Sequence, residues 1–125
     1  MRHEIALKNA LGARYTRGPW SFMKRIVVAQ RSVVPPGTCR TVEAGERAIA
    51  LCNVEGSMYA LDNTCPHAGG PLGQGHLQGH LIVCPWHRWR YDVRTGERPE
   101  NPEITVACYP VEVDGDAIAV WLPEE

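Results

Sequence analysis

Two short runs, each with one cysteine and one histidine, constrain this chain more than any other feature of its sequence. The first is Cys65-Pro66-His67 and the second is Cys84-Pro85-Trp86-His87. Thiolates and imidazoles spaced this closely are typical metal ligands. The segment between the runs, residues 68–83, is rich in glycine at its start. If the two runs face each other in the fold, four donors are available for one metal centre.

The rest of the sequence predicts an all-β scaffold for these runs. Ten prolines and twelve glycines divide the chain of 125 residues into short segments, many of them β-like and separated by turn residues. Asp114-Gly115-Asp116, for example, lies between two apolar segments and is typical of a hairpin turn. Short strands in this number indicate antiparallel sheets or a small barrel. The predicted strands cover residues 25–30, 39–44, 47–54, 57–62, 81–84, 90–93, 104–113 and 117–122.

The length is typical of one domain, but the N-terminal segment differs from the rest in composition. Residues 1–22 are basic, contain a single acidic residue, and lose a weak helical pattern at Gly18-Pro19. We predict a flexible N-terminal arm over residues 1–22 and one domain over residues 23–125. Two other interpretations of the arm are a translated stretch upstream of a functional start at Met23 and a transit peptide, which is also basic and poor in acidic residues.

Composition argues against several classes of function. A net charge of -1 and a pI near 6.5 give no basic excess for binding nucleic acid or an anionic membrane surface. No apolar run approaches the roughly 20 residues of a membrane helix. Five cysteines cannot all pair in disulfides, and two of them lie beside histidines. This pattern favours metal binding in a reducing compartment, so we expect a cytoplasmic protein without nucleic-acid or membrane partners.

Two kinds of metal centre suit two cysteines and two histidines. Tetrahedral zinc takes such a set, and so does a [2Fe–2S] cluster in which two cysteines hold one iron and two histidines hold the other. In a zinc finger the cysteines come as one pair and the histidines follow later on a helix. Here each run supplies one cysteine and one histidine, which suits two similar loops around a two-iron cluster. From the residues alone, zinc stays the alternative.

In their context, CPHAGGPL and CPWHRWRYDVRTG, the two runs resemble the Rieske family. The resemblance extends over roughly residues 25–122. It implies a Rieske-like fold of stacked antiparallel sheets with two cluster-binding loops. It also implies one Rieske-type [2Fe–2S] cluster, with Cys65 and Cys84 on one iron and His67 and His87 on the other.

Within that family, the sequence is more similar to stand-alone ferredoxins than to respiratory members or oxygenase large subunits. Respiratory members carry a disulfide between two extra loop cysteines, and the matching positions here are Gly70 and Trp86. The resemblance to the ferredoxins implies a monomeric electron carrier, not itself an enzyme. Its implied partners are a flavin-dependent ferredoxin reductase and the terminal oxygenase of an aromatic-ring-hydroxylating dioxygenase system. The alternative is the small subunit of an NAD(P)H-dependent nitrite reductase.

Two residues near the second run are expected to affect the reduction potential. Respiratory members commonly have a serine at the position of Trp89, and the serine hydroxyl raises the potential by bonding a cluster sulfide. Tyr91 matches a family position at which a tyrosine hydroxyl can reach a ligand sulfur. Such a hydrogen bond raises the potential, so it partly offsets the lower potential that the missing serine implies. We therefore expect a potential at the low end of the Rieske range, roughly −150 mV.

Other histidines and cysteines are not expected to be ligands. His76 and His80 lie in a segment that we predict to be an exposed connection, and Cys108 is expected to be a small buried thiol. The same applies to Cys39 and Cys52, for which a cross-strand disulfide is not expected in a reducing compartment.

The segment after the second run permits two interpretations. Its arginines form either a docking patch for an acidic partner or an ordinary solvated surface. Residues 97–102 are either a proline-bearing loop that closes over the cluster or a simple connector. The first arginine departs from the family, in which glycine is frequent at its position. The four arginines are Arg88, Arg90, Arg94 and Arg98.

Overall fold

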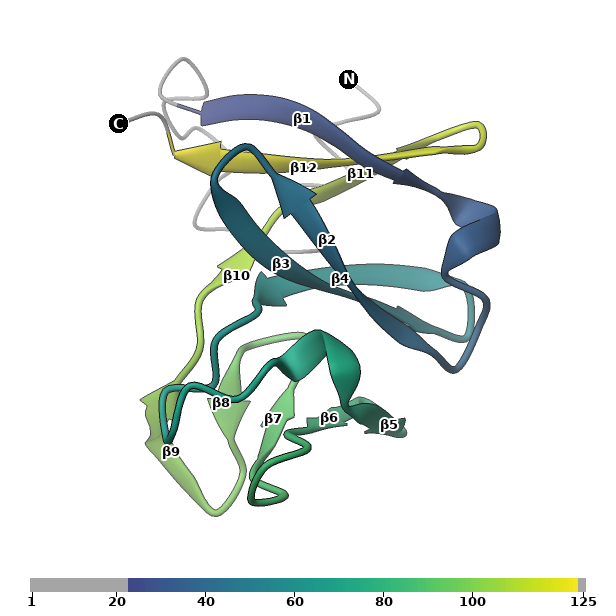
Figure 1. The fold of residues 1–125 in the computed structure, drawn as a ribbon. Coiled ribbons are helices and arrows are strands. Elements are labelled where there is room, and N and C mark those ends of the chain that lie inside the picture. Colours follow the sequence, from purple (N-terminus) through teal and green to yellow (C-terminus); the bar gives the residue numbers. More distant parts are fainter. Residues whose placement is uncertain (1–22, 124–125) are drawn as a thin grey trace.

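The computed structural model describes residues 23–123. The predicted arm, residues 1–22, and the last two residues of the predicted domain, 124–125, lie outside the described residues. The domain boundary at Met23 therefore stays a prediction. The described part of the chain consists of strands and two short 3-10 helices (Figure 1). These elements are β1 (Met23–Gln30), η3 (Arg31–Val33), β2 (Cys39–Ala44), β3 (Arg47–Val54), β4 (Ser57–Asp62), η4 (Leu72–Gln74), β5 (His76–Gln78), β6 (Leu81–Val83), β7 (Arg90–Asp92), β8 (Glu97–Arg98), β9 (Asn101–Thr105), β10 (Cys108–Tyr109), β11 (Val111–Asp114) and β12 (Ala117–Pro123).

Two antiparallel sheets form the upper part of the molecule in Figure 1. One has the strand order β1-β12-β11 and the other the order β10-β4-β3-β2. Their stacked arrangement confirms the predicted all-β class. Apolar side chains fill a first core between the sheets, among them Val34, Val42, Ile49, Leu51, Ile118 and Val120.

Strand β3 is buried on both of its faces. Successive side chains of a strand point to opposite sides of the sheet. In β3, Ile49 and Leu51 accordingly belong to the first core, whereas Ala50, Cys52 and Val54 belong to a second core. A strand covered on both sides is apolar at nearly every position, which explains why this segment shows only partial alternation in the sequence. β3 therefore supports a layer on each side of it.

The second core lies between this sheet and a smaller lobe, drawn at the bottom of Figure 1. The lobe consists of η4, the β5-β6-β7 sheet and the β8-β9 hairpin. Leu72, Ile82 and Tyr91 of the lobe are fully buried. Gly75 allows a close approach, because a Cβ atom there would lie 1.9 Å from the carbonyl oxygen of Val83. Both cysteine-histidine runs lie in or beside this lobe.

Most of the predicted strands agree with the structure. The predictions over residues 39–44, 47–54 and 57–62 match β2, β3 and β4. Glu55 and Gly56, between β3 and β4, both have positive φ, 55° and 97°, as a two-residue hairpin turn requires.

One strand prediction and one connection prediction are wrong. The predicted strand over residues 104–113 is divided among β9, β10 and β11. β10 pairs with β4 while β11 pairs with β12, so the chain changes sheets at Pro110. Residues 76–78, predicted as part of a connection, form strand β5. No helix within residues 23–123 is long and apolar enough to span a membrane.

Candidate metal centre

The two cysteine-histidine runs form two loops with the same backbone hydrogen bonds. In each loop the N–H four residues after the cysteine donates to the cysteine carbonyl, Gly69 to Cys65 at 2.8 Å and Arg88 to Cys84 at 2.9 Å. The cysteine N–H in turn donates to the carbonyl oxygen five residues after the cysteine, that of Gly70 at 2.9 Å in the first loop and that of Trp89 at 2.8 Å in the second. The sequence therefore builds one loop geometry twice.

The closing position of each loop has a left-handed backbone conformation. Gly69 has a φ of 79° and Arg88 a φ of 63°. Glycine adopts this conformation without steric cost, whereas a residue with a Cβ atom loses about 1–2 kcal/mol. The backbone geometry alone thus favours glycine at the position where Arg88 departs from the family pattern.

Each loop places its cysteine inside the protein and its histidine at the surface. Cys65 and Cys84 are 0% and 1% exposed, whereas His67 and His87 are exposed. The two imidazole rings are neighbours, with 4.9 Å between their centroids and an angle of 79° between their planes. The structure thus gathers the four predicted site residues into a buried thiol pair and an exposed imidazole pair.

The surroundings of Cys84 suit a metal-bound thiolate. Burial raises the pKa of the Cys84 thiol, and the nearby Cys65 thiol raises it further. Hydrogen bonds from the backbone N–H groups of Trp86 and His87 act in the opposite direction and lower it. Donors aimed at a sulfur atom stabilise its negative charge. The second loop therefore supplies part of what a thiolate ligand needs.

The donors of the two loops are the kind and number that a two-iron cluster takes. A Cβ atom at Gly70 would lie 2.6 Å from Cys84 Sγ and 3.1 Å from Trp86 Cγ, so glycine keeps the region beside this sulfur open. In the part of the chain that the structure describes, no group of three or more His, Cys, Asp or Glu side chains is placed to hold a single metal ion. A Rieske cluster instead takes its ligands as two pairs, one pair for each iron. The observed donor pairs match that requirement.

Tyr91 contacts the buried end of the site. Its hydroxyl oxygen lies 3.2 Å from Cys65 Sγ, and its side chain is fully buried. Burial raises the pKa of Tyr91 above its usual value, so the hydroxyl stays protonated and can donate to the sulfur. The structure thus places this hydroxyl against the sulfur of Cys65, while the role of Cys65 as a ligand stays a prediction.

Two side chains, Trp89 and Arg98, stack in turn on the first histidine. The rings of Trp89 and His67 are parallel within 11°, with centroids 3.9 Å apart. The Arg98 guanidinium lies over the Trp89 ring, 3.7 Å from its centroid, at a distance typical of a cation–π contact. Residues 97–102 form β8 and the start of β9, and this hairpin brings Arg98 to the stack. This role of Arg98 could not be predicted from the sequence, because Arg98 resembles the other arginines of its segment.

Three of the four arginines after the second run have an acidic or aromatic partner within the lobe. Arg90 and Arg94 make ion pairs with acidic residues of the same lobe, and Arg98 is held in the stack described above. Arg88 is exposed and lies next to His87 in the second loop. Of the four, it is the one placed beside the exposed imidazoles.

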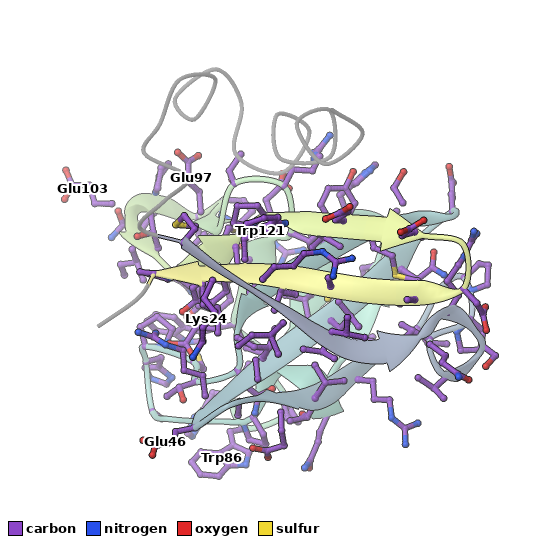
Figure 2. All side chains as sticks on the ribbon, turned by 90° about the horizontal axis from the view of Figure 1, so that it is seen from above. Lys24, Glu46, Trp86, Glu97, Glu103 and Trp121 are labelled. Atoms are coloured by element: carbon purple, nitrogen blue, oxygen red, sulfur yellow. The ribbon has the colours of Figure 1, made fainter. Side chains whose placement is uncertain are left out.

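The exposed side of the two loops forms one surface, which we call the histidine face. Trp86 is 56% exposed, and Figure 2 shows its ring projecting outward at the edge of the molecule. An indole with this exposure leaves much of its apolar surface available for a partner. The exposed residues of this face are Pro66, His67, Pro85, Trp86, His87 and Arg88.

The remaining histidines and cysteines lie outside the two loops. His76 is exposed on β5, and His80 packs edge-on against Tyr59 with 6.3 Å between ring centroids. Cys39 and Cys108 are half-buried and Cys52 is fully buried. All five cysteines of the chain fall within residues 23–123, and no disulfide joins any two of them there.

Comparison with known proteins identifies relatives of this arrangement. The model of the Rieske [2Fe-2S] domain matches residues 24–110. The ferredoxin component of the naphthalene 1,2-dioxygenase system of Pseudomonas aeruginosa is 36% identical over 90 residues, which cover 71% of this chain and 86% of that protein.

Solved structures show the same fold. A chain in the complex of reduced oxygenase and oxidized ferredoxin in carbazole 1,9a-dioxygenase has a TM-score of 0.70 and 30% identity, covering 81% of this chain and 94% of its own length. A putative NADH-dependent nitrite reductase small subunit from Mycobacterium tuberculosis has a TM-score of 0.73 and 20% identity, covering 79% and 95%. At 20% identity, the similarity to the nitrite reductase small subunit shows only a shared fold.

Proposed function

Because this chain belongs to the Rieske [2Fe–2S] family, we propose that it is the ferredoxin of an aromatic-ring-hydroxylating dioxygenase system. In this role it is an electron carrier and not itself an enzyme. It takes single electrons from a flavin-dependent ferredoxin reductase and delivers them to a terminal oxygenase. The pair of exposed imidazoles above a pair of buried thiols is the observation that supports this function most directly.

The proposed ligands are the four residues of the two loops. Cys65 and Cys84 hold the inner iron, because their thiols are the buried donors. His67 and His87 hold the outer iron at the surface. A bound Rieske cluster accepts and releases one electron at a time. The domain assigned to residues 23–125 is the unit that carries it.

The residues around the ligands have separate tasks in this function. Tyr91 donates a hydrogen bond to Cys65 at the buried end, while Trp89 packs on His67 and limits the access of water to that ring. Trp86 and Arg88 offer an apolar surface and a positive charge to a partner at the histidine face. Redox encounters bury little area, so we expect weak docking and rapid release.

The relatives support an oxygenase as one partner. The structure of the carbazole dioxygenase complex joins a ferredoxin to an oxygenase, and the naphthalene relative is a component of a dioxygenase system. A flavin-dependent reductase as the second partner and a monomeric state complete the proposal. The cytoplasm stays the proposed compartment, supported by cysteines that form no disulfide in the described residues. A role in nitrite reduction is the alternative, and only a similarity of fold supports it.

Reconstitution tests the proposed function. The purified holoprotein is combined with NADH, a ferredoxin reductase and the terminal oxygenase of a naphthalene dioxygenase system, and formation of the dihydrodiol is measured. We expect product only when this protein is present. In a parallel assay, it is added to the sirohaem subunit of a nitrite reductase. Stimulated nitrite loss without aromatic hydroxylation would replace the proposal by the alternative.

The ligand assignment has its own test. Replacing His87 by Ala removes one donor of the exposed pair, so we expect the variant to lack the visible and EPR spectra of a Rieske cluster. His76→Ala is the matched control, because His76 is an exposed histidine outside both loops, and it should keep two iron and two acid-labile sulfide per chain. A His87→Ala protein with the wild-type spectra would contradict the assignment.

A further inference from the structure

Two cysteines outside the metal centre lie directly opposite each other on neighbouring strands. Cys39 of β2 and Cys52 of β3 are partners in the antiparallel register. The neighbouring residues Thr38 and Asn53 are hydrogen-bonded, with the Asn53 N–H donating to the Thr38 carbonyl at 2.9 Å. Hydrogen-bonded and non-hydrogen-bonded pairs alternate along an antiparallel ladder, so Cys39 and Cys52 form a non-hydrogen-bonded pair. The Cα atoms of such a pair are about 4.5 Å apart, within the range of about 4.4–6.8 Å that a disulfide bridges.

The two thiols differ in their access to solvent. Cys39 is half-buried, and its thiol donates to the carbonyl oxygen of Gly75 at 3.2 Å. Cys52 is fully buried in the second core. A hydrogen bond with the Cys52 thiol lowers the pKa of Cys39, although burial raises it. The same hydrogen bond, together with burial, raises the pKa of Cys52. The more accessible sulfur is thus also the one more readily converted to a thiolate, the form that attacks disulfides.

Cys39 and Cys52 differ in this respect from the other thiols. Cys65 and Cys84 are the proposed cluster ligands. Cys108 of β10 is opposite Leu61 in the register, so no cysteine faces it across the sheet.

We propose that Cys39 and Cys52 are a modification site that forms a reversible cross-strand disulfide with a low-molecular-weight disulfide, such as oxidised glutathione, as the oxidant. This site is independent of the cluster and of the proposed function. In the first step the Cys39 thiolate attacks one glutathione sulfur and releases a glutathione thiolate. In the second step the Cys52 sulfur attacks Cys39 Sγ, the bond between Cys39 and glutathione breaks, and the departing glutathione thiolate takes the Cys52 proton. The two cysteines lose two electrons, and one glutathione disulfide becomes two glutathione molecules.

The disulfide has a local structural consequence. Once bonded to Cys52, the Cys39 sulfur has no proton to donate to the Gly75 carbonyl. Gly75 follows η4 and packs tightly against Val83, so this hydrogen bond joins β2 to the lobe that carries the metal centre. The modification therefore weakens one contact between the sheet and the lobe without using a ligand.

Peptide mapping of the holoprotein tests the proposal. The protein is incubated anaerobically with oxidised glutathione, its remaining thiols are alkylated, and it is digested with trypsin and a glutamate-specific protease. The sequence then places Cys39 in peptide 32–40, Cys52 in peptide 48–55, and both cluster cysteines in peptide 56–88. We expect a disulfide between peptides 32–40 and 48–55 that dithiothreitol removes, with an unchanged visible spectrum of the cluster.

Variants separate the outcomes. Cys39→Ser keeps a donor for Gly75 and should not form the linked peptide, and Cys52→Ala should stop at glutathione bound to Cys39. Cys108→Ser should form the link as the wild type does. The proposal is overturned if wild-type protein stays unmodified, if it accumulates only glutathionylated Cys39, or if the links formed involve peptide 56–88 instead.

Discussion

At the scale of single residues, the backbone at Arg88 shows how one position can serve two purposes. The loop requires a left-handed conformation there, as its equivalent Gly69 confirms, yet the side chain adds a charge to the histidine face. An arginine at this position therefore costs stability. In the proposed function, the charge of Arg88 is available to a partner that docks at this face.

Replacing Arg88 by Gly should stabilise the protein. Removing the Cβ atom relieves the left-handed strain, and the greater flexibility of glycine in the unfolded chain offsets part of the gain. We expect a net increase of about 0.5–1 kcal/mol, seen as a rise of about 3 °C in the thermal unfolding midpoint of the holoprotein. Arg40→Gly, in the regular strand β2, is the control and should lower the midpoint. An Arg88→Gly midpoint at or below that of the wild type would contradict this account.

Tyr91 should raise the reduction potential through its hydrogen bond to Cys65. Donors to a ligand sulfur favour the more negative, reduced state. Tyr91→Phe should therefore lower the midpoint potential, by roughly 40 mV for each kcal/mol of hydrogen-bond energy that differs between the two oxidation states. A redox titration followed by visible absorption measures it, with Tyr59→Phe as the control. The same potential in Tyr91→Phe and wild type would show that the contact does not affect the cluster.

Arg98 should act on the same potential through the stack on His67. Its guanidinium carries a positive charge over Trp89, and a nearby cation favours the reduced state. We expect Arg98→Gln to lower the midpoint potential and to change the Trp fluorescence of the protein. Arg98→Lys keeps the charge but loses the planar contact, so its potential should lie between those of Arg98→Gln and wild type. Arg40→Gln serves as the control for charge alone. Equal potentials in all four proteins would refute this role.

At the scale of elements, the sequence predicted strands where pattern and turn signals agree. β2, β3 and β4 are joined by tight turns, and the turn glycines Gly45 and Gly56 mark where one strand ends and the next begins. β8 has only two residues, too few to show the alternation of buried and exposed side chains that identifies a strand. β10 and β11 form one apolar run in the sequence, and the change of sheets at Pro110 depends on pairing with β4 and β12, which are distant in the chain.

The same distinction applies to the metal centre. That the two cysteine-histidine runs come together, and that Tyr91 reaches a cysteine sulfur, could be predicted from the short spacing and the family pattern. The stack on His67 could not, because Arg98 comes from a separate hairpin and meets Trp89 only through the tertiary fold. The left-handed conformation of Arg88 could not be predicted from the residue itself either, since arginine rarely has a positive φ.

Gly75 should be essential to how η4 and β6 pack together within the lobe. A Cβ atom there would approach the Val83 carbonyl oxygen to 1.9 Å, so Gly75→Ala must displace η4 or β6. Such overpacking costs about 1–3 kcal/mol or more, and we expect a lower thermal midpoint and reduced cluster content. Gly79→Asn is the control, because Gly79 has open space around it and a φ of 60° that asparagine tolerates. A fully loaded Gly75→Ala protein with wild-type stability would contradict this packing.

At the scale of the whole molecule, β3 separates two cores with different sources of stability. The first core lies between two sheets and consists of apolar side chains. The second core includes Cys65 and Cys84, so in the proposed function part of its stability comes from the bound cluster. Metal binding adds to folding free energy when the ligands come from separate loops.

Removal of the cluster should therefore destabilise one side of the molecule first. After iron is extracted with a chelator under reducing conditions, we expect amide hydrogens of β5, β6 and β7 to lose protection from exchange, because their layer packs around the empty loops. Amide hydrogens of β1, β11 and β12 should keep most of their protection. Uniform loss across both groups of strands, measured by mass spectrometry, would show that the two cores unfold as one unit.

The exposed imidazole pair also has a kinetic consequence. His67 and His87 lie together at one face while the thiols face the interior. In the proposed function, the electron donor and the electron acceptor therefore bind the same surface at different times. A ternary complex with both partners is then excluded, and each partner is a competitive inhibitor of the other. Raising the reductase concentration far above that of the carrier should slow overall turnover, even though it speeds the reduction step.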